Sequence, residues 1–105
     1  MFRKTTVAVL VAAVSGVLFT GSALATSSYA DGLIVSPTGV KVRSGPTTSA
    51  RIIGALDPWQ EVRLSCQIEG NSVEGNDIWY RLHGQPGWVS ARYTHNYTKV
   101  RWCEE

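Results

Sequence analysis

The sequence predicts a small all-β barrel of five to seven short strands. Apolar and polar residues alternate over short stretches, which is typical of strands with one buried face, and no stretch shows a helical period. Glycine, proline, serine and asparagine separate these stretches at close intervals, as they do in small all-β domains. The expected strands span residues 33–35, 40–43, 52–56, 61–68, 78–83, 88–91 and 98–102.

The first 25 residues are expected to be a secretory signal peptide. Arg3 and Lys4 give it a positive start, residues 5–19 are apolar, and the Ala-Leu-Ala at residues 23–25 is a small-x-small cleavage site. A cut after Ala30 is the alternative. An uncleaved membrane anchor fits less well, because the apolar run is shorter than the ~20 residues that span a bilayer. We therefore expect a protein that is secreted or held in the cell envelope, outside the cytoplasm.

Removal of the signal peptide leaves about 80 residues, enough for one domain with a small core. The whole chain has 10 Lys and Arg against 8 Asp and Glu, and Arg3 and Lys4 leave with the signal. The mature chain then has no net charge with His neutral, whereas a nucleic-acid or anionic membrane partner would need a basic patch. We therefore expect a monomer that binds neither nucleic acid nor a membrane.

Two cysteines, Cys66 and Cys103, remain in the mature chain. In an exported protein an even number of cysteines favours a disulfide bond. In residues 61–68 every second residue is apolar, and Cys66 falls in this apolar series, so it is expected to face the core. The bond would therefore tie the C-terminal tail to a central strand. Closing a loop of this length stabilises a domain by roughly 4 kcal/mol at most.

Catalytic and metal-binding uses of these residues are weaker interpretations. A thiol hydrolase pairs a cysteine with a nearby imidazole, which His83 or His95 would supply. Neither cysteine lies in a motif of such enzymes, and an inward cysteine on a strand is poorly placed for attack. The cysteines and histidines lack zinc-finger spacing, and the acidic residues fall at turns and loops. We therefore expect no enzyme, no metal site and no cofactor.

Three motifs carry a resemblance to a known family. They are Val42-Arg43-Ser44-Gly45-Pro46, Trp79-Tyr80-Arg81-Leu82 and Gly87-Trp88-Val89-Ser90. In this order and spacing they resemble bacterial SH3 domains over about residues 35–93. Lys41 departs from the family, whose members commonly carry Asn there, and so does the tail with its cysteine. The resemblance implies an SH3-like barrel at residues 33–93, after a flexible leader at residues 26–32 and before a tail at residues 94–105.

The resemblance also implies a function. Bacterial SH3 domains are mostly non-catalytic binding modules, so the expected ligand is peptidoglycan or another cell-envelope polymer, recognised through its peptide or its glycan. The alternative is a secreted protein–protein interaction module, acting as an adaptor or as an inhibitor of a wall enzyme. Fold by itself does not decide between these partners.

Four residues are the expected ligand contacts: Trp59, Trp79, Arg81 and Trp88. Alternation over residues 78–82 puts Trp79 and Arg81 on the face opposite the apolar one, so both should be displayed. Trp59 lies in a turn, where a ring is hard to bury. Displayed rings suit stacking on sugars or covering a peptide, and Arg81 suits a carboxylate. Packing is the other interpretation for every ring, and it is the favoured one for Trp88, which neighbours a valine.

The first motif also carries two expectations about the backbone. Gly45 separates a strand from Pro46, so it is expected to adopt a conformation that penalises a Cβ atom. Arg43 offers five donors and is expected to fix the loop that follows by hydrogen bonds to carbonyl groups, with a ligand carboxylate as the alternative partner.

Overall fold

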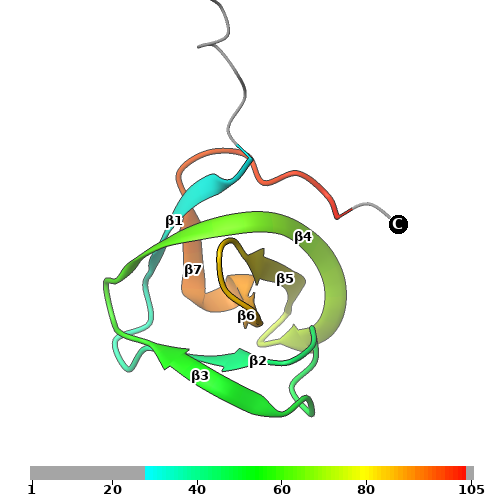
Figure 1. Ribbon diagram of the computed structural model, residues 1–105. Coiled ribbons are helices and arrows are strands. Elements are labelled where there is room, and N and C mark those ends of the chain that lie inside the picture. The colour runs from blue at the N-terminus through cyan, green and yellow to red at the C-terminus, as the bar shows by residue number, and fades with distance from the viewer. Residues whose placement is uncertain (1–27, 104–105) are drawn as a thin grey trace, which may run out of the picture.

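The computed structural model describes residues 28–103 and confirms the predicted SH3-like all-β fold (Figure 1). Its elements are β1 (Ala30–Ile34), β2 (Val40–Arg43), β3 (Ile52–Leu56), β4 (Glu61–Val73), β5 (Asn76–Leu82), β6 (Trp88–Ser90), the 3-10 helix η2 (Ala91–Tyr93) and β7 (Thr94–Asn96). The strands form one antiparallel sheet in the order β3-β2-β6-β5-β4-β1-β7. The predicted signal peptide lies outside the described residues. Within residues 28–103, no helix has the length and apolar character needed to cross a membrane.

The sheet curls around one apolar core, and β4 bends across the other strands (Figure 1). Alternate side chains point inward, as the sequence pattern predicts. Val42 of β2 and both Tyr80 and Leu82 of β5 lie in this core. Leu64 of β4 and Val89 of β6 have no exposed surface at all. Burial of these side chains is the main stabilising contribution to so small a domain.

Strand β4 is longer than the sequence pattern predicts. It runs for 13 residues, because residues 70–73, expected as a loop, carry the pairing with β5 on to Val73 opposite Asn76. Glu74 (φ 51°) and Gly75 (φ 90°) form the two-residue turn, both in the left-handed conformation that type I′ hairpin turns require. The extension escaped the pattern because its residues are mostly polar and exposed and its register is irregular.

The N-terminal strand begins earlier than expected. Residues 30–32 were predicted to belong to a flexible leader, but β1 starts at Ala30 and pairs with both β4 and β7, so it is not an edge strand. Ala30 is buried opposite Leu64. A Cβ atom on Gly32 would lie 2.8 Å from Leu64 Cδ1 and 2.9 Å from His95 O. Small residues that look like a linker in the sequence are here required by the close approach of the neighbouring strands.

The C-terminal boundary also differs from the expected one. β7 lies within the stretch expected to be a tail, whereas residues 98–102, expected as the last strand, make only one parallel bridge, to Gln67. β1 pairs with residues 61–64 of β4 and leaves the edge beyond them open. The tail fills that edge: the Gln67 N–H donates to Arg101 O (2.8 Å) and the Cys103 N–H donates to Gln67 O (2.9 Å). It thereby covers backbone groups that an open edge would leave unpaired.

The predicted disulfide bond between Cys66 and Cys103 is confirmed, with Cα atoms 4.9 Å apart. Cys66 is buried, as its parity in β4 predicts. Val100 of the tail is also buried and joins the core cluster. The tail is therefore held by a covalent bond, by backbone hydrogen bonds and by apolar contact.

The expectation for Gly45 is wrong, and Gly87 of the third motif is the constrained glycine. Gly45 has no left-handed φ, and a Cβ atom there would meet only Ala50 Cβ, at an ordinary 3.7 Å. Gly87 has φ 121°, and a Cβ atom on it would overlap Val42 Cγ1 and lie 3.3 Å from Ile53 Cδ1. Only glycine therefore lets the chain entering β6 pass so close to the β2–β3 hairpin.

Candidate functional site

An open pocket of about 520 Å³ lies against the β2–β3 hairpin. Strand β2 contributes Lys41 and Arg43 to its lining, and the turn after β3 contributes Asp57 and Pro58. Tyr93 of η2 forms part of the wall on another side. The volume is within the usual range for small-molecule sites, and both signs of charge are present around it.

Trp79 forms the floor of this pocket, and the prediction that its ring is displayed is wrong. Alternation assigns its face correctly, because the neighbouring Tyr80 and Leu82 point into the core. The ring is nevertheless only 2% exposed. Strand β4 bends so that its far end reaches the ring, and Trp79 Nε1–H donates to Asn71 O (2.9 Å). Trp79 can therefore meet a ligand only through the small part of its surface that lines the pocket.

The far end of β4 is held in place by the loop of the first motif. The Asn71 N–H donates to Pro46 O (3.3 Å), and Asn71 Oδ1 accepts from the Thr48 N–H (3.0 Å). Gly70 passes so close to this loop that a Cβ atom on it would overlap Pro46 O and lie 2.8 Å from Trp79 Cδ1. The cover over Trp79 is thus built from residues that are far apart in the sequence, which strand parity cannot predict.

Trp59 lies in the turn after β3 and is 61% exposed, as expected for a ring in a turn. Its backbone is left-handed, with φ 63°, which is a genuine outlier for a bulky side chain and costs roughly 1–2 kcal/mol. The turn is fixed by the Trp59 N–H, which donates to Ile34 O (2.8 Å). Asp57 and Pro58 of the same turn line the pocket, whereas Trp59 itself is not among the lining residues.

Arg81 and Trp88 lie outside this pocket, on neighbouring strands. They are direct partners in the β5–β6 pairing, and Trp88 also pairs with Arg43 of β2. Arg81 is exposed and Trp88 is half-buried. The structure thus brings Arg81 and Trp88 together, but it does not gather the four expected contact residues into one groove.

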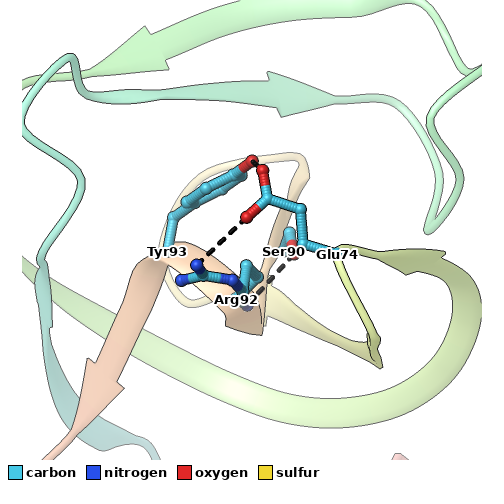
Figure 2. Close-up of polar contacts among 4 residues, drawn as sticks. All are labelled: Glu74, Ser90, Arg92 and Tyr93. Carbon is cyan, nitrogen blue, oxygen red and sulfur yellow. Dashed lines mark hydrogen bonds and ion pairs between the residues drawn. The ribbon is translucent and has the colours of Figure 1, made fainter.

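A polar cluster that includes the lining residues Ser90 and Tyr93 was not predicted from the sequence (Figure 2). Arg92 Nη2 and Glu74 Oε1 form an ion pair (3.0 Å), and Tyr93 Oη–H donates to Glu74 Oε2 (3.3 Å). Ser90 Oγ accepts from the Arg92 N–H (3.1 Å) and caps η2. Exposed pairs of this kind contribute about 0–1 kcal/mol, so the cluster's effect is to position Tyr93. The capping Ser90 was the one signal available in the sequence.

The two cations of β2 differ in their freedom. Arg43 Nη1–H donates to Ala50 O (3.1 Å), so this side chain ties the two ends of the following loop, as expected from its fork of donors. Lys41 is exposed at the pocket. Asp57 lies across the hairpin end on the turn after β3. The lining therefore offers donors to a carboxylate and an acceptor to an amine.

Tyr80 of β5 lies outside the pocket, on the core side of its strand. Burial raises the pKa of Tyr80 above its ordinary value of 10.0, but its hydroxyl lies in the core and donates to Asn96 Oδ1 (3.2 Å). Within residues 28–103, no group of three His, Cys, Asp or Glu side chains is arranged to hold a metal ion.

Comparison with known families supplies the identification. The family model described as Bacterial SH3 domain matches residues 38–95, which is more than half of the 105-residue chain. A search of curated proteins finds no match to this sequence. The matched span contains all three motifs and the strands that line the pocket, β2, β3, β4, β5 and β6. The chain therefore belongs to the bacterial SH3 domain family, whose members are typically binding modules and commonly act at the cell wall.

Proposed function

We propose that this protein is a non-catalytic module that works outside the cytoplasm and binds peptidoglycan through its peptide part. The ligand would occupy the pocket between the β2–β3 hairpin and η2. The exposed Trp59 ring, which follows the lining residues Asp57 and Pro58 in the chain, would cover it. The observation that carries the proposal is Trp59, an aromatic ring that is exposed and held in an unfavourable backbone conformation.

The cost of this conformation is the reason to connect Trp59 with function. A glycine or asparagine would adopt φ 63° at less cost, and an exposed ring returns little stability to the fold. Backbone strain of this kind clusters at ligand sites, where the binding geometry depends on it. Exposed tryptophans are also among the commonest energetic centres of interfaces.

The charges around the pocket favour a peptide ligand. Wall peptides carry free carboxylates and amino groups on a short extended chain. Lys41 and the free donors of Arg43 suit a carboxylate, and Asp57 suits an ammonium group. The buried Trp79 and the Tyr93 ring supply apolar surface between these charges.

The disulfide bond supports a place outside the cytoplasm, because such bonds persist in oxidising compartments. It agrees with the expected signal peptide. The position of Ala30 favours a cut after residue 25 over one after residue 30. A cut after Ala30 would remove the first residue of β1, which is 5% exposed and pairs with Leu64.

The alternative function, binding of a partner protein, has its own support at the edge of the sheet. β3 is the outer strand next to β2, and it exposes Ile52 (50%) and Ile53 (40%). An edge strand with unprotected apolar residues can receive a strand from a partner. An adaptor or inhibitor would use this edge in place of the pocket.

Co-sedimentation with purified wall sacculi tests the proposal. Trp59→Gly should lose binding while its stability stays equal or rises, because relief of roughly 1–2 kcal/mol of strain offsets the 0.5–1 kcal/mol entropic cost of glycine. Trp102→Ala is the matched control, since Trp102 is 53% exposed but lies in the tail, away from the pocket.

Two results would contradict the proposal. If Trp59→Gly binds sacculi with wild-type affinity, then Trp59 does not contact the ligand. Failure of the wild-type protein to sediment, together with capture of a wall hydrolase that Ile53→Lys abolishes, would instead establish the alternative function at the β3 edge.

A further inference from the structure

We infer that a second site, for a neutral N-acetylated glycan strand, lies on the outer face of β1 and β4, beside Tyr97, which follows β7. The site shares no lining residue with the pocket at the β2–β3 hairpin. The inference extends the proposed function, because peptidoglycan joins such a glycan to the peptide expected in the pocket. It rests on that function for the natural source of the glycan and for its N-acetyl groups.

Two shallow pockets adjoin on this face. Their volumes are about 310 and 370 Å³, and both are lined by Asp31 of β1 and by Glu61 and Val62 of β4. The strand register explains why they meet. Asp31 lies directly opposite Arg63, and Glu61 is two residues away on the same face of β4, so the two carboxylates are diagonal neighbours. Together the pockets form one groove with carboxylates at its middle.

An aromatic ring stands at each end of the groove. Tyr97 lines one pocket, is 58% exposed and meets His95 edge-on with ring centroids 4.8 Å apart. Tyr29 lines the other and lies against His83 at 4.8 Å. Tyr97 is thus held by a neighbour while more than half of its surface stays exposed, whereas Tyr29 is half-buried and is held by His83 and by Arg63. Rings with an apolar body and a polar tip suit the C–H faces of sugars.

The carboxylates are free to accept hydrogen bonds. The guanidinium of Arg63 lies over the Tyr29 ring, 5.1 Å from its centroid, and does not pair with Asp31. Within residues 28–103 the ion pair between Arg92 and Glu74 is the one that forms, so neither Asp31 nor Glu61 is neutralised by contact. An ionised carboxylate accepts through both oxygens, which matches neighbouring hydroxyls of a sugar ring. This combination of free acceptors and rings selects a polyhydroxylated ligand.

The charge of the groove argues for a neutral ligand. Arg63 stands within the same lining as the two carboxylates and keeps the local charge small, so a strongly cationic polymer gains little there. The groove also adjoins the first site through one turn. Asp57 and Pro58 line the pocket at β2–β3, and Gln60 lines the groove. Trp59 lies between them in the sequence.

Titration of the exported protein with a tetramer of β-1,4-linked N-acetylglucosamine tests the inference, followed by backbone amide NMR shifts. The shifts should fall on the amides of Asp31, Glu61 and Tyr97 and spare Lys41. Tyr97→Ala should weaken tetramer binding about tenfold, since a lost ring contact of this kind is worth up to roughly 1.5 kcal/mol. Tyr97→Phe should retain it, and Asp31→Asn should weaken it.

The controls separate this site from the first one. Lys41→Ala should leave tetramer binding unchanged and weaken binding of a synthetic wall peptide.

If the peptide binds and the tetramer does not at millimolar concentration, the glycan site is wrong and the proposed function stands. If the tetramer binds as above and the peptide does not, the glycan site stands and the pocket proposal fails. Tetramer shifts confined to the pocket, or wild-type affinity of Tyr97→Ala, would overturn the inference. The inference would also be overturned if the groove binds only a polyamine and releases it in about 1 M salt, where exposed charges are screened within ~3 Å.

Discussion

Trp59 and Trp79 carry the same side chain in opposite circumstances. Trp79 lies in a regular strand and is 2% exposed, whereas Trp59 lies in a turn, is 61% exposed and has a left-handed backbone. Burial of the Trp79 ring stabilises the fold, whereas the left-handed backbone of Trp59 lowers its stability. The comparison teaches that strand parity assigns a face to a side chain, but the segments that cross that face decide its role.

The largest expected effect comes from removing the covered ring. Trp79→Ala should lower the free energy of unfolding by about 3–5 kcal/mol, because it leaves a cavity beneath β4 and strands the Asn71 carbonyl without its donor. A urea melt followed by circular dichroism measures this loss. Trp59→Ala in the same melt should change stability by less than about 1 kcal/mol. Equal losses in the two variants would contradict the distinction between the rings.

How far the sequence predicts this molecule follows from the same distinction. The alternation of β2, the inward positions of Tyr80 and Leu82 in β5, and the pairing of Cys66 with Cys103 were predicted correctly, because each depends on local parity or on composition. The exposure of Trp79 was predicted wrongly, because Gly70 and Asn71 cover its ring once β4 bends. A one-dimensional pattern contains no information about such a bend.

The predicted boundaries of the domain were wrong for a related reason. Gly32 is small because β4 and β7 approach it closely on both sides, and Ala30 is buried opposite Leu64, yet small residues in sequence resemble a linker. The Glu74–Arg92 ion pair joins a hairpin tip to η2, and nothing in either segment marks the other as its partner. The left-handed backbone of Trp59 was equally hidden, since bulky residues rarely adopt it.

The disulfide bond gives the next largest effect and sharpens the comparison. Reduction should lower the free energy of unfolding by about 2–4 kcal/mol and reduce the melting temperature. The tail runs along the edge of β4 at Gln67 and does not line the pocket over Trp79. Tryptophan emission from the reduced but folded protein should therefore still contain a buried component. A thiol-reactive dye should label the protein only after reductant is added, and labelling of the unreduced, unfolded protein would contradict the bond.

Two glycines of the family motifs also differ from each other, here in how tightly the backbone is constrained. Gly87→Ala should destabilise the fold by about 1–3 kcal/mol, since φ 121° is strained for any other residue and the new Cβ atom would overlap Val42. Gly45→Ala should change stability by less than about 0.5 kcal/mol, because its φ is ordinary and its nearest neighbour would be Ala50 Cβ at 3.7 Å. Urea melts of the two variants test this pair. A larger loss at Gly45 than at Gly87 would mean that the strain lies in the first motif after all.

The smallest expected effect concerns Tyr80, which adjoins Trp79 in β5 but points to the other face. Burial raises its pKa above 10.0 in the folded protein. Because the folded state then holds the proton more tightly than the unfolded state, this stability is fully present below pH 10 and is lost as the pH rises through the folded pKa. Tyr80→Phe removes the hydrogen bond to Asn96 and should cost about 0.5–1.5 kcal/mol at neutral pH. Above pH 10 the gap between wild type and variant should shrink, because the variant has no phenol to ionise. Urea melts across this range test it, and a gap that widens with pH would mean that the phenolate, and not the phenol, is the form that the core prefers.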